Sequence, residues 1–245
     1  MIVQGENAIA FTGAGISVIS GIPDFRNPGK GRWKKYRPMV HGNYYIFLRD
    51  PIKYWTLAKE LHTTIHNAKP NLAHFALAEL EKMGKLKAII TQNIDDLHQK
   101  AGSKNVLELH GTYKTATCLK CLTKFGYEEG VEKLERGEMP PTCSCGGVIK
   151  TDLIFFGEDL PLRVFNEIFA WARKADLMIV IGIPMKVLLS RSLFKVMREG
   201  GGKSILLNFQ DVSGLKFDIK FIGENGKSLP KIVEEVKKEM GEKYG

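Results

Sequence analysis

The sequence predicts an α/β fold, a Rossmann-like doubly wound parallel sheet with a smaller zinc-binding and helical domain inserted. Short apolar runs alternate with longer amphipathic stretches along most of the 245 residues. These runs are hydrophobic throughout rather than alternating with polar residues, which is typical of strands buried on both faces. All four cysteines lie in one segment that interrupts this rhythm. The chain is therefore expected to combine a parallel sheet with a separate metal-binding insertion.

The expected strands and helices follow one another in simple alternation. The run AIAFT at 8–12 predicts the first buried strand, and a glycine-rich turn follows it. Residues 71–83 repeat apolar side chains at helical spacing, and Pro161 suits the first turn of a helix over 161–174. The run LMIVI at 177–181 is the clearest buried strand. Further strands are expected at 86–91, 106–109, 153–156 and 204–207, and further helices at 187–199 and 229–240.

Two segments break the alternation and predict the domain boundaries. One, at about 28–69, has helical patches but no buried strand, and the other, at 114–152, holds the cysteines. Together they are expected to form the small domain, with a helical module and a zinc module. The Rossmann-like domain is then expected to comprise residues 1–27, 70–113 and 153–245.

Length and composition limit the class of protein. With 44% hydrophobic and 26% charged residues, the chain can bury one full core and a small module. We find neither the roughly 18 consecutive apolar residues of a membrane helix nor a signal-peptide pattern, so a soluble cytoplasmic protein without membrane contact is expected. The net charge of +9 attracts acidic partners, but the C-terminal lysines alternate with glutamates. Direct nucleic-acid binding is therefore not expected.

The cysteines form two close pairs, Cys118 with Cys121 and Cys143 with Cys145. In a chain without extracellular signals, such pairs favour metal over disulfides. Four thiolates suit a tetrahedral, structural Zn²⁺ site, although the single residue between Cys143 and Cys145 is a tight spacing. The alternative is four free cysteines in a core.

A glycine-rich turn, Gly13-Ala14-Gly15, directly follows the first strand, with Ser17 two residues later. Glycines in this position allow backbone N–H groups to approach a pyrophosphate. A tight turn in any α/β protein looks similar, so the motif alone is weak. The third glycine of a dehydrogenase fingerprint would fall at Val18, which disfavours a dehydrogenase.

The loop after this turn reads GIPDFR and ends at Arg26. Arg26 can hold a phosphate, and Phe25, next to Asp24, can cover the face of a reactive ring. The alternative is a surface loop with one buried phenylalanine.

Polar residues gather where a later strand ends, in the run Gln92-Asn93-Ile94-Asp95. Ligands of α/β folds bind at the carboxyl ends of the strands, so these side chains are candidates for a binding site. The alternative is that Asp95 or Asp96 serves only as the N-cap of a short helix.

Two further motifs lie at strand ends. His110, followed by Gly111, suits a general base, although a lone histidine is more often structural. The segment Phe156-Gly157-Glu158 follows an expected strand, and an open backbone edge there can pair with an extended peptide. Simple termination of the strand is the alternative for this segment.

Taken together, GAGIS, GIPDFR, TQNIDDLH, HG, the paired cysteines and FFGE resemble the sirtuin family, in this order and from about residue 8 to 236. The resemblance implies a large Rossmann domain and a small zinc domain, with NAD and an acyl-lysine peptide entering the cleft between them. It implies that the acyl oxygen attacks the ribose of NAD, nicotinamide leaves, and free lysine and acyl-ADP-ribose are the products. Acyl-lysine proteins, including basic chromatin proteins, are the implied partners, and NAD and zinc the implied cofactors.

The resemblance also implies roles for single residues. Asn93 and Asp95 position the nicotinamide ribose and carboxamide, Gln92 contacts the ribose, and His110 is the general base for a ribose hydroxyl. The cofactor positions are Gly13, Ala14, Gly15, Ser17, Asp24, Phe25, Arg26, Gln92, Asn93, Ile94, Asp95, Gly182 and Asn208. The peptide-groove positions are Ile154, Phe156, Gly157 and Glu158.

This sequence departs from the family's pattern after the strand at 177–181. The family has glycine and then two hydroxyl residues, whereas here Gly182 is followed by Ile183 and Pro184. Proline supplies neither a hydroxyl nor a backbone N–H, so weaker NAD binding is expected unless Arg191 holds the phosphates instead. These departures leave open a mono-ADP-ribosyltransferase, or a weakly active homologue that binds NAD or acyl-lysine, as alternatives to an NAD-dependent protein-lysine deacylase.

Overall fold

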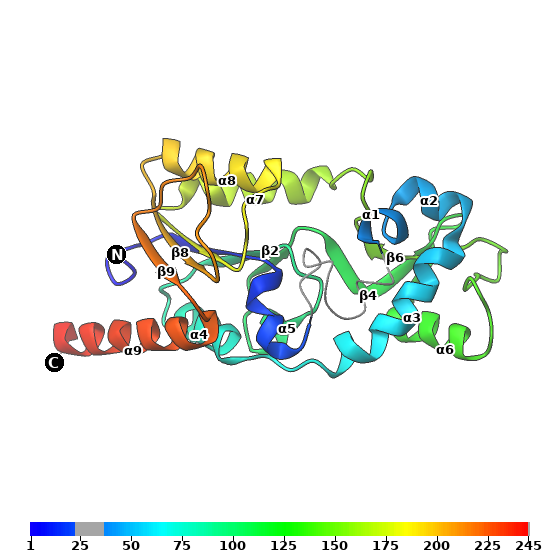
Figure 1. Ribbon diagram of the computed structural model, residues 1–245, viewed down its shortest axis with the longest axis horizontal. Helices are drawn as coiled ribbons and strands as arrows, with labels where there is room; N and C mark the ends of the chain where they lie inside the picture. Colours follow the sequence, from blue (N-terminus) through cyan, green and yellow to red (C-terminus); the bar gives the residue numbers. More distant parts are fainter. Residues whose placement is uncertain (23–36, 245) are drawn as a thin grey trace. The chain divides into compact units, whose positions relative to one another are not determined.

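The computed structural model describes residues 1–22 and 37–244, and the chain divides into two compact units (Figure 1). Unit 1 comprises Met1–Asp24, Lys69–Leu109 and Pro161–Gly245, and unit 2 comprises Phe25–Ala68 and His110–Leu160. His110 and residues 153–160 therefore belong to unit 2, whereas the sequence placed both in the Rossmann-like domain.

Unit 1 contains a sheet of six parallel strands in the order β3-β2-β1-β7-β8-β9. The strands are β1 (Ala8–Thr12), β2 (Ala88–Thr91), β3 (Val106–Glu108), β7 (Leu177–Ile181), β8 (Lys203–Asn208) and β9 (Ile219–Ile222). Ala10 of β1 pairs with Ile89 on one side and with Ile179 on the other. The strand order thus reverses between β1 and β7, which is the point where open α/β sheets bind ligands.

Helices cover both faces of this sheet, with α4 and α9 on one face and α7 and α8 on the other (Figure 1). Their bounds are α4 (Leu72–Lys82), α5 (Leu97–Lys100), α7 (Leu162–Lys174), α8 (Leu188–Glu199) and α9 (Asn225–Tyr244), and two 3-10 turns, η1 (Ala14–Ile16) and η2 (Val18–Ser20), follow β1. Asn71 caps α4, since its Oδ1 accepts the Ala73 N–H at 2.9 Å. This bond satisfies one of the amides that a helix start leaves without a partner.

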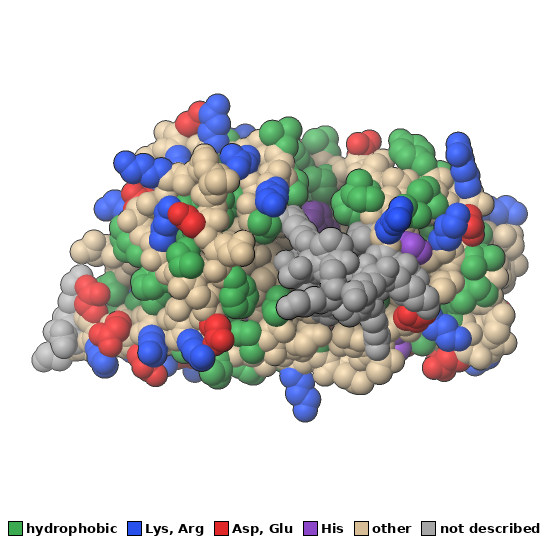
Figure 2. All heavy atoms as spheres, viewed as in Figure 1, with side chains coloured by type: hydrophobic (Ala, Val, Ile, Leu, Met, Phe, Trp, Pro, Cys, Tyr) green, Lys and Arg blue, Asp and Glu red, His purple; other side chains and the backbone are tan. Residues whose placement is uncertain are grey.

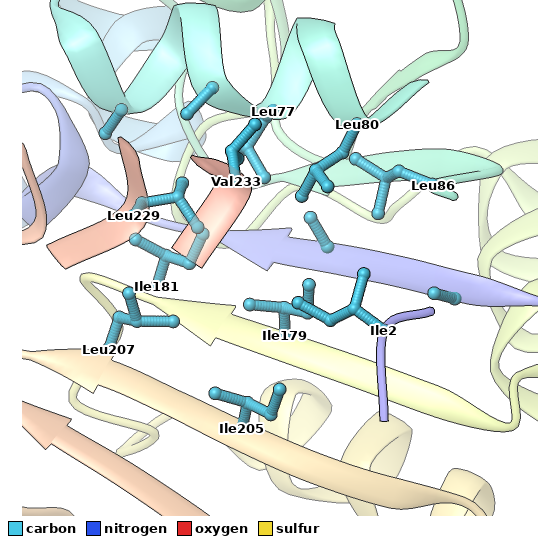
Figure 3. Close-up of a cluster of buried hydrophobic side chains, with 14 of the residues drawn as sticks. Ile2, Leu77, Leu80, Leu86, Ile179, Ile181, Ile205, Leu207, Leu229 and Val233 are labelled. Atoms are coloured by element: carbon cyan, nitrogen blue, oxygen red, sulfur yellow. The ribbon is translucent and has the colours of Figure 1, made fainter. Parts of the chain in front are cut away.

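Apolar side chains of α4 and α9 form the core against the sheet (Figure 3). In Figure 3 they point toward the sheet, and the cluster includes Leu77, Leu80, Leu229, Val233, Ile179, Ile181, Ile205 and Leu207. Complete burial of one such side chain stabilises the fold by about 1.5–3 kcal/mol. This core fixes the strand ends that carry the polar residues described below.

In its described part, unit 2 combines four helices with a three-stranded antiparallel sheet in the order β5-β4-β6. The elements are α1 (Pro38–His41), α2 (Tyr44–Arg49), α3 (Pro51–Asn67), β4 (Gly111–Cys118), β5 (Lys124–Gly126), α6 (Tyr127–Glu135) and β6 (Ile149–Leu153). Trp55 of α3 is fully buried and donates its indole N–H to the Ile149 carbonyl at 3.0 Å. This contact ties the helices of unit 2 to its sheet.

The parallel sheet with helices on both faces confirms the predicted fold class. The strand expected at 153–156 is wrong, because β6 ends at Leu153 and the next residues form a loop. The sequence did not reveal the antiparallel sheet of unit 2, since β4 reads GTYKTATC and is only partly apolar. Short strands with many threonines give a weak pattern of hydrophobicity.

Charged side chains are dispersed on the face drawn in Figure 2, where lysine and arginine lie among aspartate and glutamate. Within the described residues, no helix is long and apolar enough to cross a membrane.

Candidate functional site

The carboxyl ends of β1, β2, β7 and β8 lie at one edge of the sheet in unit 1, because these strands are parallel. Polar side chains end three of the four strands, namely Thr12 on β1, Thr91 on β2 and Asn208 on β8, and all three are buried. Polar groups at the end of apolar strands are unusual for a core and mark a candidate binding site.

Two glycine-containing turns touch at this edge, one after β1 and one after β7. A Cβ atom on Gly15 would lie 2.6 Å from the Cα of Gly182, and a Cβ on Gly182 would lie 2.5 Å from the amide nitrogen of Ile16. Gly182 also has a φ of +65°, a conformation that other residues rarely adopt. Only glycine at both positions allows the two backbones to approach so closely.

The amides of this turn correct one expectation drawn from the sequence. The N–H of Gly13 donates to the Ile181 carbonyl at 3.0 Å, and the N–H of Gly15 donates to the Gly182 carbonyl at 3.1 Å. These two amides hold the turns of β1 and β7 together, so they cannot also bind a pyrophosphate. The two glycines are required for close packing of the backbone. Ala14, which is half-buried, remains the candidate for contact with a ligand in this turn.

A buried hydrogen-bond network centres on Ser17. Its hydroxyl donates to Oδ2 of Asp95 at 2.7 Å and accepts the Nδ2–H of Asn93 at 3.0 Å. Asn93 also donates to the Gly13 carbonyl at 3.2 Å, and its own N–H donates to the Thr91 hydroxyl at 3.1 Å. The network therefore fixes Asn93 and Asp95 at the carboxyl end of β2, through hydrogen bonds to Ser17 and Gly13, which follow β1.

Two buried histidines complete the network and act as neutral donors. Nδ1 of His74 accepts the Asn71 N–H at 3.3 Å, so the proton is on Nε2, which lies 3.5 Å from the Ser17 hydroxyl. Thr12 donates to the Thr91 hydroxyl at 2.8 Å, so it accepts from Nε2–H of His98 at 2.8 Å. Burial lowers the pKa of His74 to about 4 and holds the pKa of His98 well below its usual range. Both rings are therefore uncharged at neutral pH.

Asp95 is held by two donors, although it is not the N-cap of α5, which is Asp96. Its Oδ1 accepts the Leu97 N–H at 3.0 Å at the start of α5, while its Oδ2 accepts from Ser17. Burial raises the pKa of Asp95, and the bonds from Ser17 and Leu97 oppose this rise. A buried carboxylate held by two donors is an ordered negative charge, which suits the positioning of a polar ligand.

Arg191, in α8 after β7, contacts two backbone carbonyls. The guanidinium Nε donates to the Met185 carbonyl at 2.8 Å and NH2 donates to the Ser213 carbonyl at 3.1 Å, so Arg191 ties two loops together. Ile183 is fully buried and lies beside Gly13, which makes it part of the core rather than a ligand contact. Pro184 is half-buried, whereas Gly182 and Ile183 are buried.

Other expected cofactor residues lie at or near the same edge. Gln92 donates its side-chain N–H to the buried Ser190 hydroxyl at 2.7 Å, a contact between β2 and α8. Asn208 ends β8 and donates to the Ile183 carbonyl at 3.4 Å, and Ile94 is half-buried. The expected contacts of Asp24, Phe25 and Arg26 lie outside the described residues.

In unit 2, His110 directly precedes β4 and is half-buried. Its carbonyl accepts the Ile154 N–H at 2.9 Å. A Cβ on the next residue, Gly111, would lie 2.1 Å from the Asp152 carbonyl oxygen, and Gly111 has a φ of +70°. Glycine is therefore required after His110, because the chain turns sharply against β6.

The loop after β6 changes the expectation for peptide pairing. The N–H of Phe156 donates to the Gly42 carbonyl at 2.8 Å, and its carbonyl accepts the Tyr44 N–H at 3.0 Å. An open backbone edge at Phe156 is therefore wrong, since both groups are used within unit 2. Its side chain is exposed, and so is Gly157, so these two residues and the half-buried Ile154 keep their candidate role.

Glu158 has a structural contact that the sequence did not reveal. Its carboxylate lies 3.0 Å from the ammonium of Lys150 and accepts the Phe155 N–H at 2.9 Å. Burial lowers the pKa of Lys150, and the contact with Glu158 opposes this change. Removal of Glu158 would leave a buried ammonium without its carboxylate. Glu158 therefore stabilises the loop, in addition to its expected role in the peptide groove.

The four cysteines come together in unit 2, as their spacing predicted. The Sγ atoms of Cys118 and Cys145 are 3.5 Å apart, those of Cys121 and Cys143 are 3.6 Å apart, and all four lie within 4.8 Å of one another. Zn–S bonds of about 2.3 Å in a tetrahedron place sulfur atoms roughly 3.8 Å apart. The cluster therefore fits a structural Zn²⁺ site with four thiolate ligands.

These features define a class of α/β protein, in which a Rossmann-like sheet with a polar edge is joined to a four-thiolate module. The Sir2 family model matches residues 13–188. An NAD-dependent protein deacetylase of Saccharolobus solfataricus is 43% identical over 240 residues, which cover 98% of this chain and 96% of that protein. NAD-dependent protein deacylase 2 of Archaeoglobus fulgidus is 42% identical over 245 residues, with 99% and 96% covered. The chain belongs to the Sir2 family.

Solved structures of Sir2 proteins are similar along almost the whole chain. One, described as "Structural Basis for the Mechanism and Regulation of Sir2 Enzymes", has a TM-score of 0.88 and 42% identity and covers 97% of this chain and 95% of its own. Another, "Sir2-p53 peptide-NAD+", has a TM-score of 0.86 and 35% identity, with 98% and 95% covered.

Proposed function

We propose that this protein is an NAD-dependent protein-lysine deacylase that transfers the acyl group of an acylated lysine to ADP-ribose and releases nicotinamide. The observation that carries the proposal is the pair of half-buried Asn93 and buried Asp95, which Ser17 holds in one network at the ligand-binding edge of a Sir2-family sheet. Relatives about 40% identical are named as NAD-dependent deacetylases and deacylases. Related structures are described with an acetylated peptide and with a propionylated peptide.

NAD supplies the ADP-ribose that accepts the acyl group, and this chain's residues position it. We assign Asn93 and Asp95 to the nicotinamide ribose and carboxamide and Gln92 to the ribose. Ala14, Ser17, Ile94, Gly182 and Asn208 complete the described part of the cofactor site. The hydrogen bonds from Ser17 and to the Gly13 carbonyl fix Asn93 and Asp95, which reduces the entropy cost of positioning a ligand.

We assign His110 the role of general base, which removes a proton from a ribose hydroxyl so that its oxygen attacks the acyl carbon. Histidine suits this role because its ordinary pKa lies near neutrality. Ile154, Phe156 and Gly157 are assigned to the acyl-lysine peptide, with Glu158 as the support of their loop. Basic chromatin proteins are one class of substrate that fits this assignment, and four reduced cysteines suit a cytoplasmic enzyme.

The decisive experiment incubates the zinc-loaded protein with NAD and an acetyl-lysine peptide and identifies the products by mass spectrometry. Deacetylated peptide, nicotinamide and acetyl-ADP-ribose in equal amounts are expected. Asn93→Ala should remove this turnover, whereas Asn67→Ala, an exposed residue at the end of α3, should not. ADP-ribose attached to the peptide would instead favour a mono-ADP-ribosyltransferase, and binding without turnover would favour a reader of acyl-lysine.

A further inference from the structure

A second group of metal-ligating side chains lies in unit 2, separate in composition from the cysteine cluster. Within residues 1–22 and 37–244, His62, His66 and Glu128 are the other set whose ligand atoms all lie within 4.8 Å of one another. His62 and His66 are one helical turn apart on α3, and Glu128 is in the first turn of α6. None of the three lies in a motif that the sequence singles out.

The helices that carry these side chains share one buried apolar cluster. Leu61 and Ile65 of α3 pack with Tyr127 and Val131 of α6 in one buried apolar cluster. The start of α6 is further fixed because the carboxylate of Glu129 accepts the Gly126 N–H at 2.8 Å. Metal sites built on packed helices keep their donors in place, whereas sites on loops do not.

The local contacts of the three side chains already resemble those of a metal centre. Nδ1 of His66 lies 3.5 Å from Oε1 of Glu128, and the imidazole rings of His62 and His66 have centroids 5.3 Å apart. Nδ1 of His62 is buried and has no hydrogen-bond partner among the described residues. An unpaired buried nitrogen is costly, and a bound cation would satisfy it.

We propose that His62, His66 and Glu128 form a second metal site, which takes a divalent transition ion such as Zn²⁺, Co²⁺ or Ni²⁺. Two imidazoles and one carboxylate are a donor set that suits these ions, whereas Mg²⁺ and Ca²⁺ require mostly oxygen ligands. Metal–nitrogen bonds of about 2.0–2.1 Å require donors roughly 3.3 Å apart, which small side-chain rotations achieve from the present spacing. Three protein ligands leave at least one position for water.

The site's position indicates what the ion does. The side chains of His66 and Glu128 are 57% and 63% exposed, so an ion can enter directly from solvent. Since two ligands come from α3 and one from α6, the ion links these helices and stabilises unit 2. The site is independent of the proposed deacylase activity, because none of the three residues was assigned to NAD or to the peptide.

The test uses the full chain with its cysteines loaded by one equivalent of Zn²⁺, titrated calorimetrically with Ni²⁺. One further equivalent should bind, and the melting temperature should rise with Ni²⁺ concentration. His66→Gln and Glu128→Gln should each weaken Ni²⁺ binding at least about tenfold and remove the rise in melting temperature. Glu132→Gln, which removes the same charge one turn later on α6 where Glu132 faces Arg136, should bind Ni²⁺ as the wild type does.

His66→Gln and Glu128→Gln change exposed side chains, so both variants should fold even if replacement of the less exposed His62 does not. Titration with Co²⁺ adds a spectroscopic check, because ligation by thiolates gives intense charge-transfer absorption that nitrogen and oxygen ligands lack. When Co²⁺ binds at the proposed site, only weak visible absorption bands are expected. Strong thiolate absorption, no second equivalent, or equal Ni²⁺ binding by wild type, His66→Gln and Glu128→Gln would each overturn the proposal.

Discussion

Replacement of Ser17 by alanine tests whether its hydroxyl organises the candidate site. The hydroxyl donates to the Asp95 carboxylate at 2.7 Å and accepts from the Asn93 amide at 3.0 Å. Alanine has nearly the same volume but makes neither bond. The Asp95 carboxylate would then keep the Leu97 amide as its donor among the described contacts.

The expected loss of stability follows from the types of bond removed. A bond to a charged acceptor contributes about 1.5–3 kcal/mol, and one between neutral groups contributes about 0.5–1.5 kcal/mol. Ser17→Ala should therefore lower the free energy of unfolding by about 2–4 kcal/mol, a large share of the roughly 5–15 kcal/mol of a typical domain. Ser20→Ala is the matched control, because this hydroxyl accepts only a neutral bond from Asn71 at 2.9 Å and should cost about 1 kcal/mol.

The effect should also depend on pH in a defined direction. Burial raises the pKa of Asp95, and the bond from Ser17 opposes the rise. A carboxyl group whose folded pKa lies above its unfolded pKa binds its proton more tightly when folded, so its contribution favours folding at low pH and is lost as pH rises through the folded pKa. Without Ser17 this pKa rises further. The cost of Ser17→Ala should therefore be small where Asp95 is protonated and reach its full size above the folded pKa.

Urea unfolding of the wild type, Ser17→Ala, Ser20→Ala, Asp95→Asn and the double variant at neutral and acidic pH measures these quantities. In the Asp95→Asn background, Ser17→Ala should cost less, about 1–3 kcal/mol, because both bonds that it removes are then between neutral groups. A pH profile of nicotinamide release should show the acid limb of Ser17→Ala at higher pH than that of the wild type. An equal cost in both backgrounds, or one no larger than that of Ser20→Ala, would refute the reasoning.

Four further predictions concern the other parts of the site. His110→Ala should lower turnover by about two to four orders of magnitude and should lower the rate of nicotinamide exchange much less. Rapid-quench kinetics measures both rates, and equal losses would indicate a binding role. Cys121→Ser should reduce the zinc content measured by elemental analysis and lower the melting temperature, and a metal-free variant that melts like the wild type would contradict the zinc assignment. Sir2-family members that remove acidic acyl groups carry a Tyr-x-x-Arg motif, whose positions correspond to Ala58 and Leu61 of α3; neither side chain can pair with a carboxylate, so in a competition assay an acetyl-lysine peptide should be consumed before a succinyl-lysine peptide. Pro184→Ser supplies a hydroxyl and an N–H and should lower the KM for NAD about two- to tenfold with less change in kcat, whereas an unchanged KM would mean that this segment does not contact NAD.

The sheet and the position of the candidate site could be predicted from the sequence for a physical reason. Parallel strands buried on both faces must be apolar along their length, as 177–181 is, and their carboxyl ends must share one edge. The polar run at Gln92 and the turn at Gly13 follow two such strands, so their proximity required no knowledge of packing. The cysteine cluster was equally predictable, because the spacing of ligands to a tetrahedral ion is a local property.

The rest depended on contacts between residues distant in the chain. His74 looks in the sequence like any polar residue of an amphipathic helix, and only the packing of α4 brings it to Ser17, 57 positions away. The two backbone carbonyls that Arg191 contacts, those of Met185 and Ser213, could not be foreseen from the sequence either. The β4 strand was missed because its exposed face carries threonine and lysine, which weaken the apolar pattern.

The contact between Gly15 and Gly182 has a consequence for mutational tolerance. The atoms that a side chain at either position would meet belong to the opposing main chain, so no second substitution elsewhere can make room for it. Compensation, which usually rescues a clash between side chains, is not available to this pair. In a saturation library selected for folding, both positions should therefore accept glycine alone, and they should show no covariation with each other. Flanking positions such as Ala14, which is half-buried, should vary freely in the same library until selection for NAD use is added.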